Sequence, residues 1–122
     1  MVDEKIQKRN RANKRRGADF ETDLVNEFRQ RGLVADRLHL SGKDDEGDIY
    51  VRSQLGDLEF IVEAKNVQTL DLAGFVKELR AERENYAKHR DWLAPIDGYV
   101  IIKRRGKPVE ESYVVTTVKD FF

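Results

Sequence analysis

The segment from Gly47 to Lys65, GDIYVRSQLGDLEFIVEAK, is expected to form two strands and carries charged side chains at its two ends. Asp48 opens the first strand, and Glu63 and Lys65 close the second. Two carboxylates with an ammonium beside them suit a divalent cation that activates water. The segment therefore predicts a metal-assisted hydrolytic site.

The spacing of these residues predicts that they meet. Side chains alternate along a strand, so Glu63 and Lys65 share one face. A turn over residues 54–57 makes the preceding strand antiparallel and returns Asp48 beside Glu63, with fourteen residues between them in the chain. With the carbonyl of Ala64, the two acids would give Mg²⁺ an all-oxygen site, and Lys65 would lie beside the activated water. The alternative is a surface ion pair between Asp48 and Lys65, worth about 0–1 kcal/mol.

A glutamate inside an apolar helical stripe adds a further candidate. From Asp19 to Arg31, apolar residues recur at helical spacing, with Asp19 as the expected N-cap and Gly32 after the end. Relative to Phe20, Glu21 falls at about 100° on the helical wheel, within the apolar arc. An ionised carboxylate there needs a cation to face. The alternative is a side chain on the rim whose head reaches water.

The composition limits the other kinds of site. The chain has 122 residues, of which 39% are apolar, and this suits one domain. Cys is absent and His39 and His89 are the two histidines, which excludes disulfides, thiolate zinc sites and a histidine-rich metal site. Oxygen ligands favour Mg²⁺, or Mn²⁺ in its place. The sequence contains no long apolar run or signal peptide, so we expect a soluble, cytoplasmic protein.

The zero net charge is unevenly distributed. Residues 1–16 have a balance of +5, and residues 17–122 a balance of −5. A basic arm on an acidic body is typical of proteins that bind a polyanion, although a solvated tail explains it equally well. We therefore expect an arm over 1–16 and one domain over 17–122. The arm bases predicted to contact phosphates are Lys8, Arg9, Arg11, Lys14, Arg15 and Arg16.

The remaining elements complete an α/β pattern. We expect strands over 33–40, 48–53 and 58–65, a helix from Asp71 to about Arg90, and strands over 98–104 and 112–118. The order α-β-β-β-α-β-β indicates one mixed sheet flanked by helices. Alternating charge at Glu78, Arg80 and Glu82 predicts a solvated helix face. Trp92 and the terminal phenylalanines are expected in the core or in a dimer contact.

Taken in order, KRRGADFETDLVNEF, RLHLSG, GDI and EAK resemble the motifs of archaeal-type Holliday junction resolvases, within the PD-(D/E)xK nuclease superfamily. The resemblance covers residues 14 to about 65 and implies a restriction-endonuclease-like core. The proline that gives the superfamily its name is replaced by Gly47, and the chain after Asn66 matches no resolvase motif.

The resemblance also implies roles for individual residues. Asp48 and Glu63 match the metal-binding acids, Lys65 the catalytic lysine and Glu21 the helix glutamate that positions the metal or its water. Ser41 matches a loop serine of the active site and Arg37 a phosphate-contacting arginine, and we add Lys43 of the same loop to the expected DNA contacts.

These features predict a Mg²⁺-dependent endonuclease that acts, as a homodimer, on branched DNA such as a four-way junction, with no other small-molecule cofactor. Three alternatives stay open. One is a nuclease of the same fold that acts on flapped, single-stranded, mismatched or duplex DNA. The second is a DNA-binding module of the same fold that does not cut. The third is a nucleic-acid-binding protein in which these charged residues form only a structural ion-pair cluster.

Overall fold

The computed structural model describes residues 3–39 and 44–122 and has the order of main elements that the sequence predicts. A short 3₁₀ helix and a C-terminal helical turn are additional. The elements are α1 (Glu4–Gln30), β1 (Val34–Arg37), β2 (Ile49–Arg52), β3 (Glu59–Lys65), α2 (Leu72–His89), β4 (Asp97–Ile102), η1 (Val109–Glu111), β5 (Tyr113–Val115) and α3 (Val118–Phe121).

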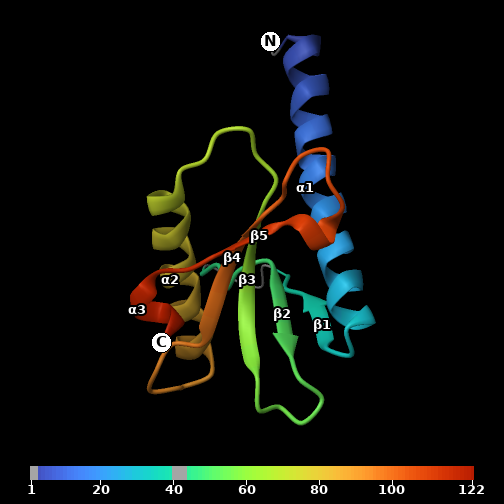
Figure 1. Cartoon of the computed structure of the whole chain (residues 1–122). Coiled ribbons are helices and arrows are strands. Elements are labelled where there is room, and N and C mark those ends of the chain that lie inside the picture. The colour runs from blue at the N-terminus through green and yellow to red at the C-terminus, as the bar shows by residue number, and fades with distance from the viewer. Residues whose placement is uncertain (1–2, 40–43) are drawn as a thin grey trace.

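The five strands form one mixed sheet in the order β1-β2-β3-β4-β5. β3 and β4 are parallel and are connected through α2, whereas the other neighbouring strands are antiparallel. Figure 1 shows α1 and α2 on either side of the sheet. This arrangement confirms the predicted mixed sheet with flanking helices, and it places the end of β3 next to α2.

Each face of the sheet has its own apolar cluster, because successive side chains of a strand point to opposite faces. On the α1 side, Phe20 and Leu24 pack with Ile49 and Val62. On the α2 side, Leu79 and Tyr86 pack with residues that include Ile61. The central strand β3 is therefore buried along most of its length. Glu63 and Lys65 continue the face of Ile61, toward α2.

α1 begins fifteen residues before the predicted start at Asp19, so that prediction is wrong. Its N-cap is Asp3, whose carboxylate accepts a hydrogen bond from the Lys5 amide at 3.0 Å. Most residues between Glu4 and Arg16 favour helix, and an exposed helix needs no apolar stripe. The basic segment is thus the first half of α1 and projects beyond the sheet (Figure 1). The division into arm and domain stays a prediction.

Other boundaries differ less from the predictions. α2 begins after its predicted N-cap, Asp71, whose carboxylate accepts from the Gly74 amide at 3.0 Å. β1 is four residues long, shorter than the predicted 33–40, and β5 is three residues long. Trp92 and Phe122 are 41% and 95% exposed, so they lie outside the core, and the alternative of a dimer contact stays a prediction. Among the described residues, no helix has the length and apolar character needed to cross a membrane.

Two glycines test whether α1 is continuous. A Cβ at Gly17 would contact nothing within 4 Å, and Gly32, just after the helix, has a φ of +85°. We expect Gly17→Ala to raise the free energy of unfolding by about 0.5–1 kcal/mol, because glycine is a poor residue for a helix interior. Gly32→Ala should lower it by about 1 kcal/mol or more. Urea unfolding followed by circular dichroism measures both effects. No gain from Gly17→Ala would contradict a helix that runs through residue 17.

Candidate metal centre and basic groove

The pairing of β2 with β3 brings Asp48 to Glu63. Ile49 lies opposite Val62, and the Asp48 amide donates to the Val62 carbonyl at 2.9 Å. The Asp48 carboxylate accepts from the Ala64 amide through Oδ2 at 2.8 Å. The two carboxyl groups are close enough for the charge of Glu63 to raise the pKa of Asp48. The two predicted metal-binding acids are therefore adjacent.

Lys65 contacts acids other than Asp48. Its Nζ lies 3.3 Å from Glu63 Oε1 and 2.9 Å from Glu78 Oε2. Burial alone would lower the pKa of Lys65, but the pairs with Glu78 and Glu63 raise it overall. Lys65 is thus a cation at neutral pH and suits charge stabilisation better than proton abstraction. The alternative ion pair between Asp48 and Lys65 does not occur in the described part of the chain.

The Asp48 carboxyl group is strained electrostatically. Burial, followed by the charge of Glu63, raises its pKa to about 8, and the charge of Glu21 adds to the rise. The hydrogen bond from Ala64 opposes this shift without cancelling it. Without a cation, Asp48 therefore keeps its proton near neutral pH, whereas a bound cation would favour the carboxylate that coordinates it.

A third buried carboxyl group continues the row. Glu82 of α2 is 2% exposed and faces Glu63, which is 5% exposed. Burial and then Glu63 raise the pKa of Glu82 to about 11, and burial raises the pKa of Glu63 as well. Asp48, Glu63 and Glu82 together form what we call the carboxyl row. The predicted solvated face of α2 is therefore wrong at Glu82.

Glu82 also belongs to an acidic triad with Asp45 and Glu78. Each of these residues offers a carboxylate oxygen, and the three oxygens lie within 4.8 Å of one another. Glu78 and Asp45 are exposed, so the triad is open to solvent on one side. By its geometry, this triad is able to hold a metal ion.

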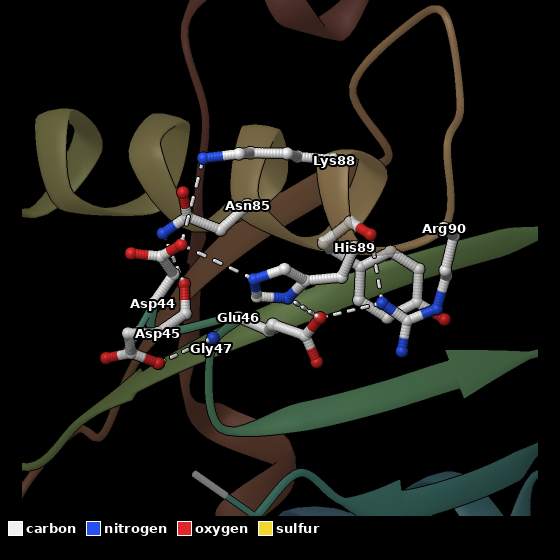
Figure 2. Close-up of polar contacts among 9 residues, drawn as sticks. Asp44, Asp45, Glu46, Gly47, Asn85, Lys88, His89 and Arg90 are labelled. Carbon is white, nitrogen blue, oxygen red and sulfur yellow. Dashed lines mark hydrogen bonds and ion pairs between the residues drawn. The ribbon is translucent and has the colours of Figure 1, made fainter. Parts of the chain in front are cut away.

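The loop that carries Asp45 is fastened to the C-terminal part of α2. The Asn85 amide donates to the Asp45 carbonyl at 2.8 Å, and Glu46 contacts His89 Nδ1 at 2.6 Å and Arg90 at 2.7 Å (Figure 2). The Gly47 amide donates to Asp45 Oδ1 at 2.8 Å. These bonds hold the Asp45 side chain near α2 and fix the start of β2, where Asp48 lies.

Glu21 has a protein cation as its partner. Its Oε2 lies 2.8 Å from the guanidinium of Arg37 on β1. Arg37, which the resemblance assigns to phosphate binding, is thus paired with Glu21. The charge of Glu21 also contributes to the raised pKa of Asp48. Its role toward metal stays a prediction. Ser41 and Lys43 lie outside the described residues.

A groove of about 810 Å³ runs from the basic half of α1 to the candidate centre. Arg9, Arg16 and Arg105 line it together with Ala64 and Lys65. Arg9 and Arg16 are seven residues apart, so they lie about 20° apart on the helix. The other predicted arm bases do not line this groove. The predicted phosphate contacts therefore divide into two bases that line the groove, Arg9 and Arg16, and four that do not.

Sequence reasoning missed Asp45, Glu78 and Glu82. A signal existed for Glu82, which follows Leu79 by three residues and precedes Tyr86 by four and so falls in the apolar stripe of α2. The same argument had singled out Glu21. Asp45 and Glu78 carried no comparable signal, because exposed acids are frequent in this chain.

Comparisons with known proteins support the fold. No protein-family model matches the chain, and no curated protein matches it in sequence. Among solved structures, it is similar to Hjc, a Holliday junction resolvase from the archaeal hyperthermophile Archaeoglobus fulgidus, with a TM-score of 0.51 and 24% identity. The match covers 78% of this chain and 74% of that chain. This likeness confirms the restriction-endonuclease-like α/β fold.

The raised pKa of Asp48 predicts a pH-dependent stability. A folded pKa of about 8, against an ordinary 3.8, means that the folded chain keeps a proton that the unfolded chain releases. In a chelating buffer, the free energy of unfolding should therefore fall as pH rises from about 5 to about 8, by up to about 1.4 kcal/mol per pH unit. Asp48→Asn should flatten this fall. Equal slopes for the two proteins in urea unfolding would contradict the shift.

Proposed function

We propose that this protein is a metal-dependent DNA endonuclease that acts on branched DNA such as a four-way junction. The observation that carries the proposal is the position of Asp48, Glu63 and Lys65. The two acids adjoin each other, and Lys65 lies beside Glu63 and also lines a groove with Arg9, Arg16 and Arg105. Lys65 thus connects the basic groove to the carboxyl row, because it lines the groove and pairs with Glu63.

The donor set fits a hard divalent cation. Asp48 and Glu63 would hold the ion, and Oε2 of Glu63 is buried and without a hydrogen-bond donor among the described residues. When bound, Mg²⁺ supplies charge for the phosphate and makes water a stronger nucleophile. Lys65, kept charged by its acidic neighbours, orients the phosphate or the attacking water and stabilises the developing negative charge. The Ala64 amide fixes the orientation of Asp48.

Two considerations support a junction as the substrate. The solved structure with the same fold is described as a Holliday junction resolvase, and the sequence motifs resemble that family. A homodimer would place two copies of the centre about a twofold axis and cut two strands symmetrically. The alternatives are another DNA substrate for the same chemistry, or a binding module that does not cut. Digestion of labelled four-way, flapped, single-stranded and duplex DNAs with Mg²⁺, with and without a chelator, separates the three.

Neutral substitutions test the chemistry. Asp48→Asn and Glu63→Gln should each lower the cleavage rate by at least about a hundredfold, because each removes a charged oxygen ligand. Binding of the four-way junction should change by less than roughly threefold, which is under about 1 kcal/mol. Asp97→Asn, an exposed position at the opposite end of the sheet, is the control. Cleavage at the wild-type rate by either site variant would refute the assignment.

The groove predicts which bases of α1 contact DNA. Replacing Arg9 and Arg16 together by Gln should reduce the slope of log K against log salt by about 2, at about 0.9 for each phosphate contact. The matched pair Lys8 and Arg15 also lies seven residues apart, but about 100° away on the helix. Changing that pair to Gln should alter the slope less. Equal changes for both pairs, measured by fluorescence anisotropy, would remove the groove as the preferred path of the DNA backbone.

A further inference from the structure

Glu82 is a buried charge-bearing group without a donor. Both of its carboxylate oxygens lack a hydrogen-bond partner among the described residues, and the side chain is 2% exposed. The group it faces is the carboxyl of Glu63, whose Oε2 also lacks a donor. Two carboxyl groups satisfy each other only if one of them is protonated. An ionised Glu82 therefore needs a cation from solution.

The charges around Glu82 are unbalanced. Five acids belong to the triad and the carboxyl row, and their ion pairs in the described structure involve one ammonium, that of Lys65. Burial of several ionised carboxylates costs several kcal/mol unless a positive charge compensates. The five acids are Asp45, Asp48, Glu63, Glu78 and Glu82.

The geometry points to a second divalent-cation site, which we call the α2 site, held by Asp45, Glu78 and Glu82 and adjacent to Glu63. It uses no residue that the motifs of the sequence assign to metal, and it does not require that the chain cut DNA. Glu63 lies between this site and Asp48, so the two sites would share one carboxylate neighbour.

The spacing of the triad is compatible with one bound ion. Oxygens on opposite sides of Mg²⁺ or Mn²⁺ are about 4.2 Å apart, and those around Ca²⁺ about 4.8 Å apart. The triad oxygens lie within 4.8 Å of one another, close enough for the three side chains to converge on one ion when they adjust to it. Oxygen ligands select a hard cation. The exposed side at Asp45 and Glu78 admits the ion and the waters that complete its coordination.

Hydrogen bonds hold the loop residue of the site in place. Asp45 is held by its bond with the Gly47 amide and by the contact of its carbonyl with Asn85 (Figure 2). Glu78 already forms an ion pair with Lys65 through Oε2. A carboxylate has two oxygens, so it is able to bind a metal ion and an ammonium group together.

Binding of Mn²⁺, counted near pH 7.5 by electron paramagnetic resonance and isothermal titration, tests this inference without DNA. We expect two ions per wild-type chain. Glu82→Gln should weaken one of them at least tenfold, because the variant keeps the shape but removes the charge. Glu78→Gln, at an exposed position that leaves folding unaffected, should weaken the same ion. Glu84→Gln, on the same helix and exposed, is the matched control and should bind two ions with wild-type affinity.

The two proposals fail in different ways. The α2 site is overturned if the wild type binds only one ion and both Glu82→Gln and Glu78→Gln keep that ion at wild-type affinity. This result leaves the nuclease centre intact. The α2 site is supported if the wild type binds two ions, Asp48→Asn keeps one of them, and a chain that carries both Asp48→Asn and Glu82→Gln loses that remaining ion. Binding of no Mn²⁺ at millimolar concentration overturns both. A proton shared by Glu63 and Glu82 would then account for their burial.

Discussion

The burial of acids at the end of β3 is the constraint on which the rest of the structure depends. Asp48, Glu63 and Glu82 come from a loop, a central strand and a helix, yet their carboxyl groups lie in a row within one poorly hydrated region. Burial and mutual repulsion both oppose ionisation, so these carboxyl groups retain protons when no cation is bound. A fold that depended on stability alone would fill this place with apolar side chains. The cation proposed above would compensate the charge of these acids.

The sheet topology creates this arrangement. Antiparallel pairing of β2 with β3 returns Asp48 to the end of β3, and the parallel crossover to β4 lays α2 over that same end. The face that holds Ile61 in the apolar cluster continues to Glu63 and Lys65, so the polar centre is an extension of the core surface toward the groove. Rigid elements, rather than loops, position most of its side chains. Of the two loop residues, Asp48 is held by the Ala64 amide of β3, and the carbonyl of Asp45 accepts a hydrogen bond from Asn85 of α2.

The sequence predicted those parts of the site that depend on local rules. Strand alternation and the tight turn were sufficient to place Asp48 beside Glu63, because both act over fewer than twenty residues. The approach of Glu78 and Glu82 to β3 depends on how α2 packs on the sheet, which no local spacing encodes. The start of α1 was missed for the opposite reason. Its first turns are stabilised by residue propensity and the Asp3 cap, and they carry no apolar period to detect.

Glu21 and Glu82 show how similar patterns lead to different chemistry. Both are glutamates within apolar helical stripes, but Glu21 meets Arg37 of β1 at 2.8 Å, whereas Glu82 meets another acid. The charge of Glu21 is therefore balanced inside the protein, and that of Glu82 is not. Only the second arrangement calls for a partner from solution. The pairing partner, more than the burial of the acid, thus decides whether a carboxylate in a helix stripe is structural or available to a metal.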